Sequence, residues 1–159
     1  MQLTWNDICA DSSLQNLPYK IETNRWGQIV MSPAKRWHSK RQGKIAQQLS
    51  ELKRGGHIYS ELAVETSEGV KVMDVGWSSD AFDQAHSQED TLTAAPELCI
   101  EVLSVSNSRD EIQEKITLYF AYGAKEVWTC DDKSRMTFYT SPTQEVAKSG
   151  LFPGFPSQS

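Results

Sequence analysis

The pattern of apolar and polar residues along the chain predicts a mixture of strands and helices. The strongest strand pattern is 98–103, which is short, apolar on both sides of its alternation and carries one carboxylate, Glu101. Such a strand usually lies buried on both faces of a sheet. Apolar and β-branched runs predict three hairpins, formed by 19–22 with 28–31, 57–66 with 70–77, and 126–130 with 135–140.

Two longer stretches have the spacing and the punctuation of helices. The first, 34–54, follows a proline and ends before two glycines, and its stripe at steps of three and four residues is His38, Gln42, Ile45, Leu49 and Leu52. The second begins at the capping box of Ser108 and Glu111 and runs to about Tyr122. A shorter helix is expected near 3–8. These elements predict a mixed β-sheet flanked by the two long helices, an α/β or α+β sandwich with N-terminal and C-terminal hairpins.

The length and the cysteine content bound the class of protein. A chain of 159 residues fits one domain. We expect a core spanning about 19–140 and an aromatic tail, 141–159, docked on it. No stretch approaches the length of a membrane span. The three cysteines form an odd set without metal-type spacing, which favours a reducing, cytoplasmic setting.

The net charge of −5 excludes a globally basic nucleic-acid coat, but the charge is unevenly distributed. Residues 35–54 hold seven Lys or Arg against one acid, whereas from Gly55 onward seven basic residues face seventeen acidic ones. Lys40, Arg41 and Lys44 in this basic segment are candidates for phosphate contacts that do not read sequence. A solvated helix face is the alternative.

Two carboxylates, Asp74 and Glu101, stand inside strand-like segments. A buried ionised carboxylate is costly unless a cation or several donors meet it. If the two lie on neighbouring strands and point the same way, a divalent cation would relieve their repulsion, and Mg²⁺ suits such oxygen ligands. The alternative is that each carboxylate lies at a strand end and faces water.

Three further residues, Lys115, His38 and Gln42, each allow two interpretations. Lys115 lies near the buried stripe of the second helix and would place a cation beside the metal; alternatively it forms a solvated pair with Glu111, four residues earlier. His38 and Gln42 either reach into a polar cleft at the sheet edge or belong to a half-exposed helix end.

The chain resembles the Uma family of endonucleases, within the PD-(D/E)xK restriction-endonuclease-like superfamily. The resemblance spans nearly the whole chain, from Met31-Ser32-Pro33 to 151–156. Its most specific segments are 96–104, Glu114-Lys115 and 122–128. Asp74-Val75-Gly76-Trp77 is similar to the family's "PD" element, with Met73 in place of the usual proline.

The resemblance implies specific roles for the candidate residues. Asp74 and Glu101 match the motif metal ligands, and the main-chain carbonyl of Val102 would be a third ligand. Leu103 stands where the motif has its lysine, and Lys115 matches the position to which the lysine has moved in this family. Glu61 is an additional candidate ligand, and His38 and Gln42 match polar positions that contact the substrate or the metal ligands.

These observations predict an endonuclease that hydrolyses phosphodiester bonds of DNA with Mg²⁺ or Mn²⁺. The alternative is a catalytically weak or inactive nuclease-fold module that binds nucleic acid or protein. A third hypothesis is an assembly subunit, with the Trp26 hairpin and the aromatic tail at a homodimer interface.

Overall fold

A six-stranded mixed sheet forms the centre of the protein, whose computed structural model describes residues 3–33, 35–52 and 55–158. The strands run in the spatial order β3-β4-β5-β6-β7-β8, and only β5 and β6 are parallel neighbours. Their bounds are β3 His57–Thr66, β4 Gly69–Ser78, β5 Leu98–Val102, β6 Glu126–Cys130, β7 Met136–Ser141 and β8 Gln144–Val146.

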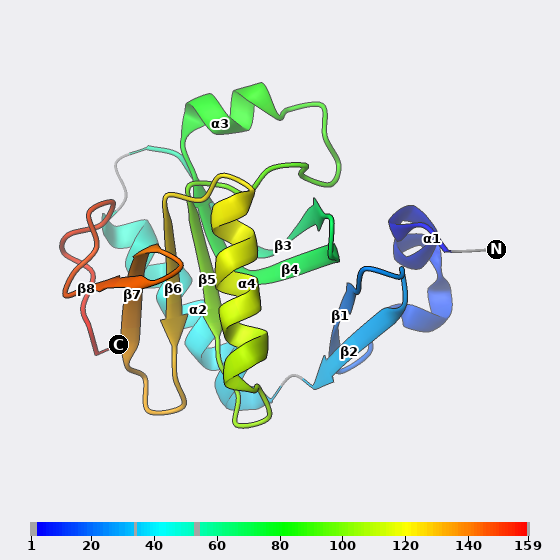
Figure 1. The fold of residues 1–159 in the computed structure, drawn as a ribbon, viewed down its shortest axis with the longest axis horizontal. Coiled ribbons are helices and arrows are strands. Elements are labelled where there is room, and N and C mark those ends of the chain that lie inside the picture. Colours follow the sequence, from blue (N-terminus) through cyan, green and yellow to red (C-terminus); the bar gives the residue numbers. More distant parts are fainter. Residues whose placement is uncertain (1–2, 34, 53–54, 159) are drawn as a thin grey trace.

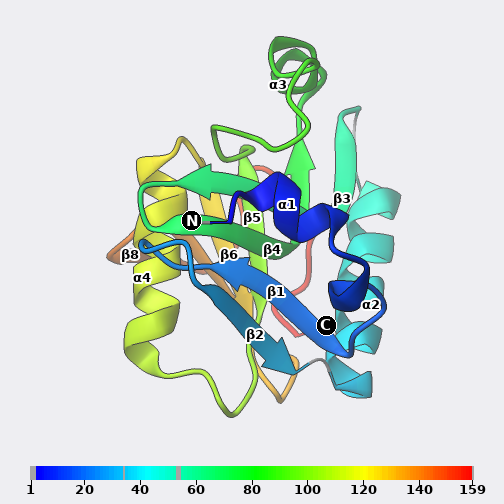
Figure 2. The ribbon, with the colours of Figure 1, turned by 90° about the vertical axis from the view of Figure 1, so that its right-hand side faces the viewer.

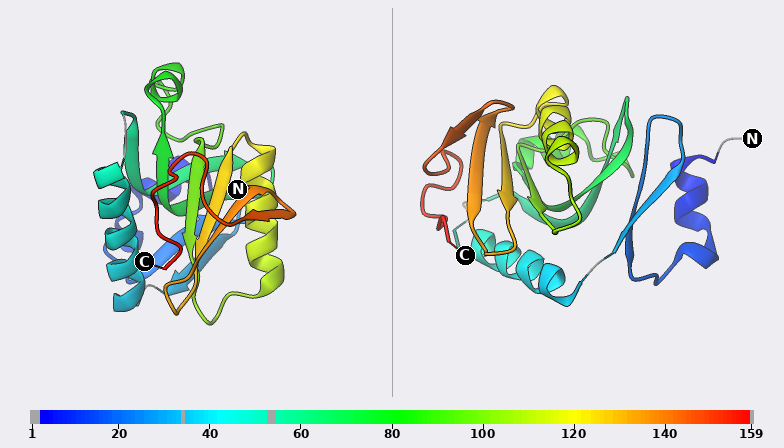
Figure 3. Two further views of the ribbon diagram at one scale, coloured as in Figure 1. Left: turned by 90° about the vertical axis from the view of Figure 1, so that its left-hand side faces the viewer. Right: turned by 60° about the horizontal axis from the view of Figure 1, so that its bottom comes forward.

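Helices cover both faces of this sheet (Figures 1 and 3). Helix α2, Arg36–Leu52, lies on one face, and α4, Arg109–Ala121, lies on the other and connects the parallel strands β5 and β6. The shorter helices are α1 Trp5–Ala10, the 3-10 helix η1 Ser12–Leu14 and α3 Asp80–Ala85. No helix in the described part of the chain is long and apolar enough to cross a membrane.

Two apolar cores result, one on each side of the sheet. Below α2, the side chains of Leu98 and Ile100 pack with Trp128 and with Phe152 and Phe155 of the C-terminal segment. Below α4, a second set of side chains forms the other core: Val64, Met73, Ala95, Cys99, Ile116, Tyr119, Ala124 and Val127. Successive side chains of β5 point into the two cores in turn, which explains why this strand is apolar on both faces.

The first hairpin forms a separate two-stranded sheet of β1, Tyr19–Thr23, and β2, Ile29–Pro33 (Figure 2). It is fastened to β4 through side chains. The Val70 N–H donates to Thr23 Oγ1 at 2.8 Å, and the Val72 N–H donates to Glu22 Oε2 at 2.7 Å. The hairpin thus satisfies backbone donors of β4.

The predicted fold class is confirmed: a mixed sheet is flanked by two long helices, with an N-terminal hairpin and C-terminal strands. Three details differ. A third C-terminal strand, β8, was not expected; Leu52, predicted on the buried stripe of α2, is 38% exposed; and the N-terminal helix lies at Trp5–Ala10 rather than 3–8. Residues 34, 53 and 54 of the predicted first helix lie outside the described residues.

Candidate active site

The two carboxylates predicted to converge do so. β4 and β5 pair antiparallel with Val75 opposite Ile100, which places Asp74 and Glu101 at the next matching positions and on the same face. Both residues are buried, with 1% and 7% of their surface exposed. A face shared by two buried carboxylates requires compensating charge or donors.

Lys20, from β1, supplies part of that charge. Its Nζ atom lies 3.2 Å from Asp74 Oδ1 and 3.2 Å from Glu101 Oε2. The Lys20 side chain is only 13% exposed. The ammonium group therefore sits between the two carboxylates and neutralises part of their repulsion.

The other oxygen of each carboxylate is held by a different donor. The Val102 N–H donates to Asp74 Oδ2 at 2.7 Å, and the Tyr119 hydroxyl donates to Glu101 Oε1 at 2.6 Å. Val102 belongs to β5 and Tyr119 to α4. Strand and helix thereby fix the orientation of both acids.

Lys115 reaches the same site from α4. Its Nζ atom lies 2.8 Å from Glu22 Oε2 and 3.5 Å from Glu101 Oε1. Glu111, the alternative partner, instead completes the capping box at Ser108. Lys115 therefore points into the site and not along a solvated helix face.

His38 lies at the edge of the carboxylate pair. Its Nε2 atom is 2.9 Å from the Val102 carbonyl oxygen and 3.5 Å from Asp74 Oδ2. The His38 side chain is 15% exposed, so the start of α2 is packed against the site and is not a frayed end. Gln42, one turn later, donates from Nε2 to Ser60 Oγ at 2.8 Å.

Burial and charge shift the pKa values of these groups in different directions. Burial raises the pKa of Asp74, but Lys20 and His38 outweigh it and hold that pKa below its ordinary value. At Glu101 burial prevails over Lys115 and Lys20, and the pKa is raised. Burial lowers the pKa of Lys20, but Glu101 and Asp74 outweigh it and raise that pKa. Asp74 is thus ionised and Lys20 protonated at neutral pH.

A cleft of about 730 Å³ opens onto these residues. The hairpin lines one side with Trp26, Val30 and Met31, and α2 contributes His38 and Gln42. Glu61, on β3, also lines the cleft and is exposed, with its backbone in the left-handed region at φ 56°.

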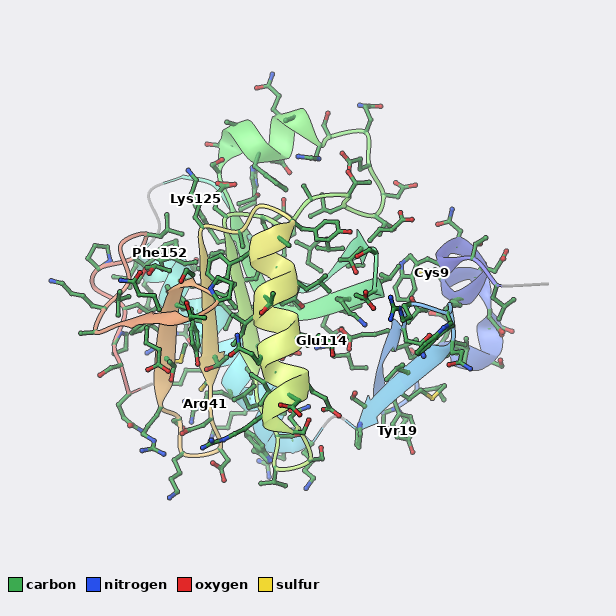
Figure 4. All side chains as sticks on the ribbon, in the orientation of Figure 1. Cys9, Tyr19, Arg41, Glu114, Lys125 and Phe152 are labelled. Atoms are coloured by element: carbon green, nitrogen blue, oxygen red, sulfur yellow. The ribbon has the colours of Figure 1, made fainter. Side chains whose placement is uncertain are left out.

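The basic residues of α2 have a different position. Lys40 and Lys44 are exposed and Arg41 is half-buried, and among the described residues the lining of the cleft includes none of the three. In the view of Figure 4, the label of Arg41 lies to the left of α4 and that of Tyr19, which marks the hairpin, lies to its right. Phosphate contacts by these three residues stay a prediction, outside the cleft itself.

Sequence reasoning missed Lys20, Glu22 and Tyr119. Lys20 and Glu22 alternate onto one face of β1, but their charged partners are 54 to 93 residues away in the chain. The alternation predicts that the two side chains share a face, but it does not predict which distant residues they contact. Tyr119 is buried on α4, and its hydroxyl contact with Glu101 follows only from the packing of α4 on β5.

The donor set at the carboxylate pair fits a hard divalent cation. Asp74 and Glu101 offer carboxylate oxygens, and Val102 offers a carbonyl oxygen that, like Asp74 Oδ2, lies close to His38 Nε2. Within the described ranges no group of three or more His, Cys, Asp and Glu side chains is arranged to hold a metal. Mg²⁺ requires no such group because it binds through one or two carboxylates and keeps several waters.

Comparison with known proteins is consistent with this class of fold. The crystal structure of a protein from Anabaena variabilis, described as a putative nuclease belonging to DUF820, superimposes with a TM-score of 0.66 at 21% sequence identity, covering 81% of this chain and 77% of that chain. The likeness defines a nuclease-like fold. A comparison with curated proteins gave no match.

The sequence itself identifies the family. The Uma2 family, described as "Putative restriction endonuclease", matches residues 11–156. The chain belongs to the Uma2 family.

Proposed function

We propose that this protein is a divalent-cation-dependent endonuclease that hydrolyses phosphodiester bonds of DNA. The observation that carries the proposal is the convergence of Asp74 and Glu101 on one buried face, each with one oxygen directed at a single cationic position. Membership of a restriction-endonuclease family and a nuclease-like fold support the same reaction class.

Each residue of the site has a proposed role. Asp74, Glu101 and the carbonyl of Val102 would hold Mg²⁺ or Mn²⁺, with Glu61 at the cleft wall as a further candidate. When bound, the cation supplies a water of lowered pKa and positive charge beside the phosphate. Lys115 stabilises the charge that develops on the phosphodiester oxygens.

Neighbouring side chains keep these groups in position. Glu22 accepts from Lys115 at 2.8 Å and prevents its ammonium from turning to solvent. The Tyr119 hydroxyl orients Glu101 at 2.6 Å. His38, held against the Val102 carbonyl and Asp74, and Gln42 at the cleft wall are available to contact the substrate.

The proposal is tested with a metal-ligand variant. We expect Asp74→Asn to lower cleavage of plasmid DNA in Mg²⁺ or Mn²⁺ by more than about 100-fold, because a ligand loses its charge. Asp132→Asn, which removes an exposed acid from the turn before β7, is the matched control and should cleave as the wild type does. Assays with single-stranded DNA and RNA define the substrate class.

A binding module without turnover is the second candidate. The placement of Lys20 between the acids favours it, because the site is already charge-compensated without a metal. Binding of DNA without cleavage by the wild type, at any concentration of Mg²⁺ or Mn²⁺, would contradict the endonuclease proposal and support this one.

A further inference from the structure

We infer that Lys20 occupies the cation position of the carboxylate pair, so that a divalent metal binds only by displacing the Lys20 ammonium. The inference rests on the proposed function, because it concerns the metal proposed for that site. Lys20, which belongs to β1 of the hairpin, therefore competes with the metal for the two carboxylates.

The oxygen atoms that Lys20 contacts are the ones that a metal would take. Asp74 uses Oδ2 for the Val102 N–H, and Glu101 uses Oε1 for the Tyr119 hydroxyl and Lys115. The remaining oxygens, Asp74 Oδ1 and Glu101 Oε2, both lie 3.2 Å from Lys20 Nζ. Carboxylate oxygens are the ligands that Mg²⁺ would take, and it binds them more closely than an ammonium does, so the metal and Lys20 would compete for these two atoms.

Sterics and charge make the two cations mutually exclusive. An ammonium at hydrogen-bonding distance from both oxygens leaves no room for an ion between them, and like charges this close repel. Once Lys20 leaves, the two acids keep their orientation, since Val102 and Tyr119 hold them independently. The ligands are therefore preorganised for the incoming metal.

The cleft offers space for the Lys20 side chain once a metal displaces it. It lines the cleft of about 730 Å³, and its side chain has a flexible four-carbon stem. Glu22, two residues along the same strand, lies on the same wall of the cleft. Displacement therefore requires a rotamer change and does not require the hairpin to undock.

Competition of this kind weakens the apparent metal affinity. If only one molecule in ten has its carboxylates free of Lys20, the apparent dissociation constant is about tenfold weaker than the intrinsic one. Replacing Lys20 with an uncharged residue should therefore strengthen the apparent metal affinity by that tenfold factor.

The test is calorimetric titration of the full chain with Mn²⁺ and with Mg²⁺, without substrate. We expect Lys20→Met to bind Mn²⁺ about tenfold or more tightly than the wild type. Lys20→Arg, which keeps a cation, should show no such gain. Lys71→Met is the matched control, because Lys71 lines the same cleft but donates to the Thr23 carbonyl at 3.0 Å; its affinity should stay at the wild-type value.

A double variant locates the binding. Asp74→Asn combined with Lys20→Met should lose the gain, which shows that the tighter metal lies at the carboxylate pair. Circular dichroism checks that each variant is folded, and Lys20→Gln replaces Lys20→Met if that variant does not fold.

The outcomes separate the inference from the proposed function. Equal or weaker affinity in Lys20→Met than in the wild type, with binding that depends on Asp74, overturns the inference and leaves the metal site standing. Absence of Asp74-dependent binding in every variant overturns both.

Discussion

At the residue scale, the site is an arrangement of buried charges that compensate one another. Three buried carboxylates, Glu22, Asp74 and Glu101, meet two lysines, Lys20 and Lys115. Removing one partner of a buried pair commonly costs about 3–5 kcal/mol, because it leaves an uncompensated charge. Variants at these positions must therefore be assayed for folding as well as for activity.

Lys115 provides the sharpest residue-scale prediction. We expect Lys115→Met to reduce the cleavage rate by about 100-fold or more, because a positive charge aimed at the developing phosphate charge is lost. Lys125→Met is the control: Lys125 is exposed just before β6, away from the hairpin, and should retain the wild-type rate (Figure 4). Single-turnover kinetics measures the effect. An unchanged rate in Lys115→Met would remove Lys115 from the mechanism.

At the scale of elements, a single acid joins the C-terminal segment to the sheet. Glu126, at the start of β6, is 4% exposed. Its Oε2 atom accepts from Trp128 Nε1 at 2.8 Å and from Ser149 Oγ at 2.6 Å. Its Oε1 atom accepts from the N–H groups of Gly150 and Leu151 at 2.7 and 2.9 Å. These bonds place Phe152 and Phe155 in the core below α2.

Removal of this acid should loosen the C-terminal segment. We expect Glu126→Ala to lower the free energy of unfolding by about 3 kcal/mol, because four donors lose their acceptor and two of these hydrogen bonds are buried. Chemical denaturation followed by Trp fluorescence measures the change. The exposed acid Glu51 of α2, changed to Ala, should shift stability by less than about 0.5 kcal/mol. A comparable loss in both variants would contradict the role given to Glu126.

At the scale of the whole molecule, the three cysteines differ in how far the packed layers shield them from solvent. Cys9 is exposed, whereas Cys99 and Cys130 are buried in β5 and β6. Burial raises the pKa of the Cys99 thiol well above its ordinary value and that of Cys130 to about 11. Both thiols are therefore protonated and shielded at neutral pH.

Thiol labelling should separate these environments. At pH 8 we expect one thiol per folded chain to react rapidly with a disulfide reagent, since only about one in a thousand Cys130 thiols is ionised at that pH. The reaction of the other two should be limited by opening of the structure, and all three should react in denaturant. Rapid reaction of a second thiol in the folded protein would contradict this packing.

The hairpin also exposes apolar side chains at this scale. Trp26 is 68% exposed, Tyr19 45%, Met31 42% and Val30 40%. A homodimer interface at this hairpin stays a prediction.

Much of the architecture followed from local pattern. The alternation in β5 and the capping box of α4 determine element type through residues close together in the chain, which a sequence displays directly. Asp74 and Glu101 were found because a carboxylate is conspicuous in an apolar strand. β8 was missed because three residues are too short for a periodicity to show.

The sequence by itself determined the mixed-sheet class, the two acids and the helix that carries Lys115. Tertiary structure decided what compensates those acids. Lys20 reaches Asp74 across 54 positions and Glu101 across 81, and Lys115 reaches Glu22 across 93. Periodicity in the sequence relates only residues that are a few positions apart. These contacts depend instead on how the hairpin docks against β4 and how α4 packs on β5. For that reason the position where we propose a metal, already filled by a lysine of the same chain, became visible only in three dimensions.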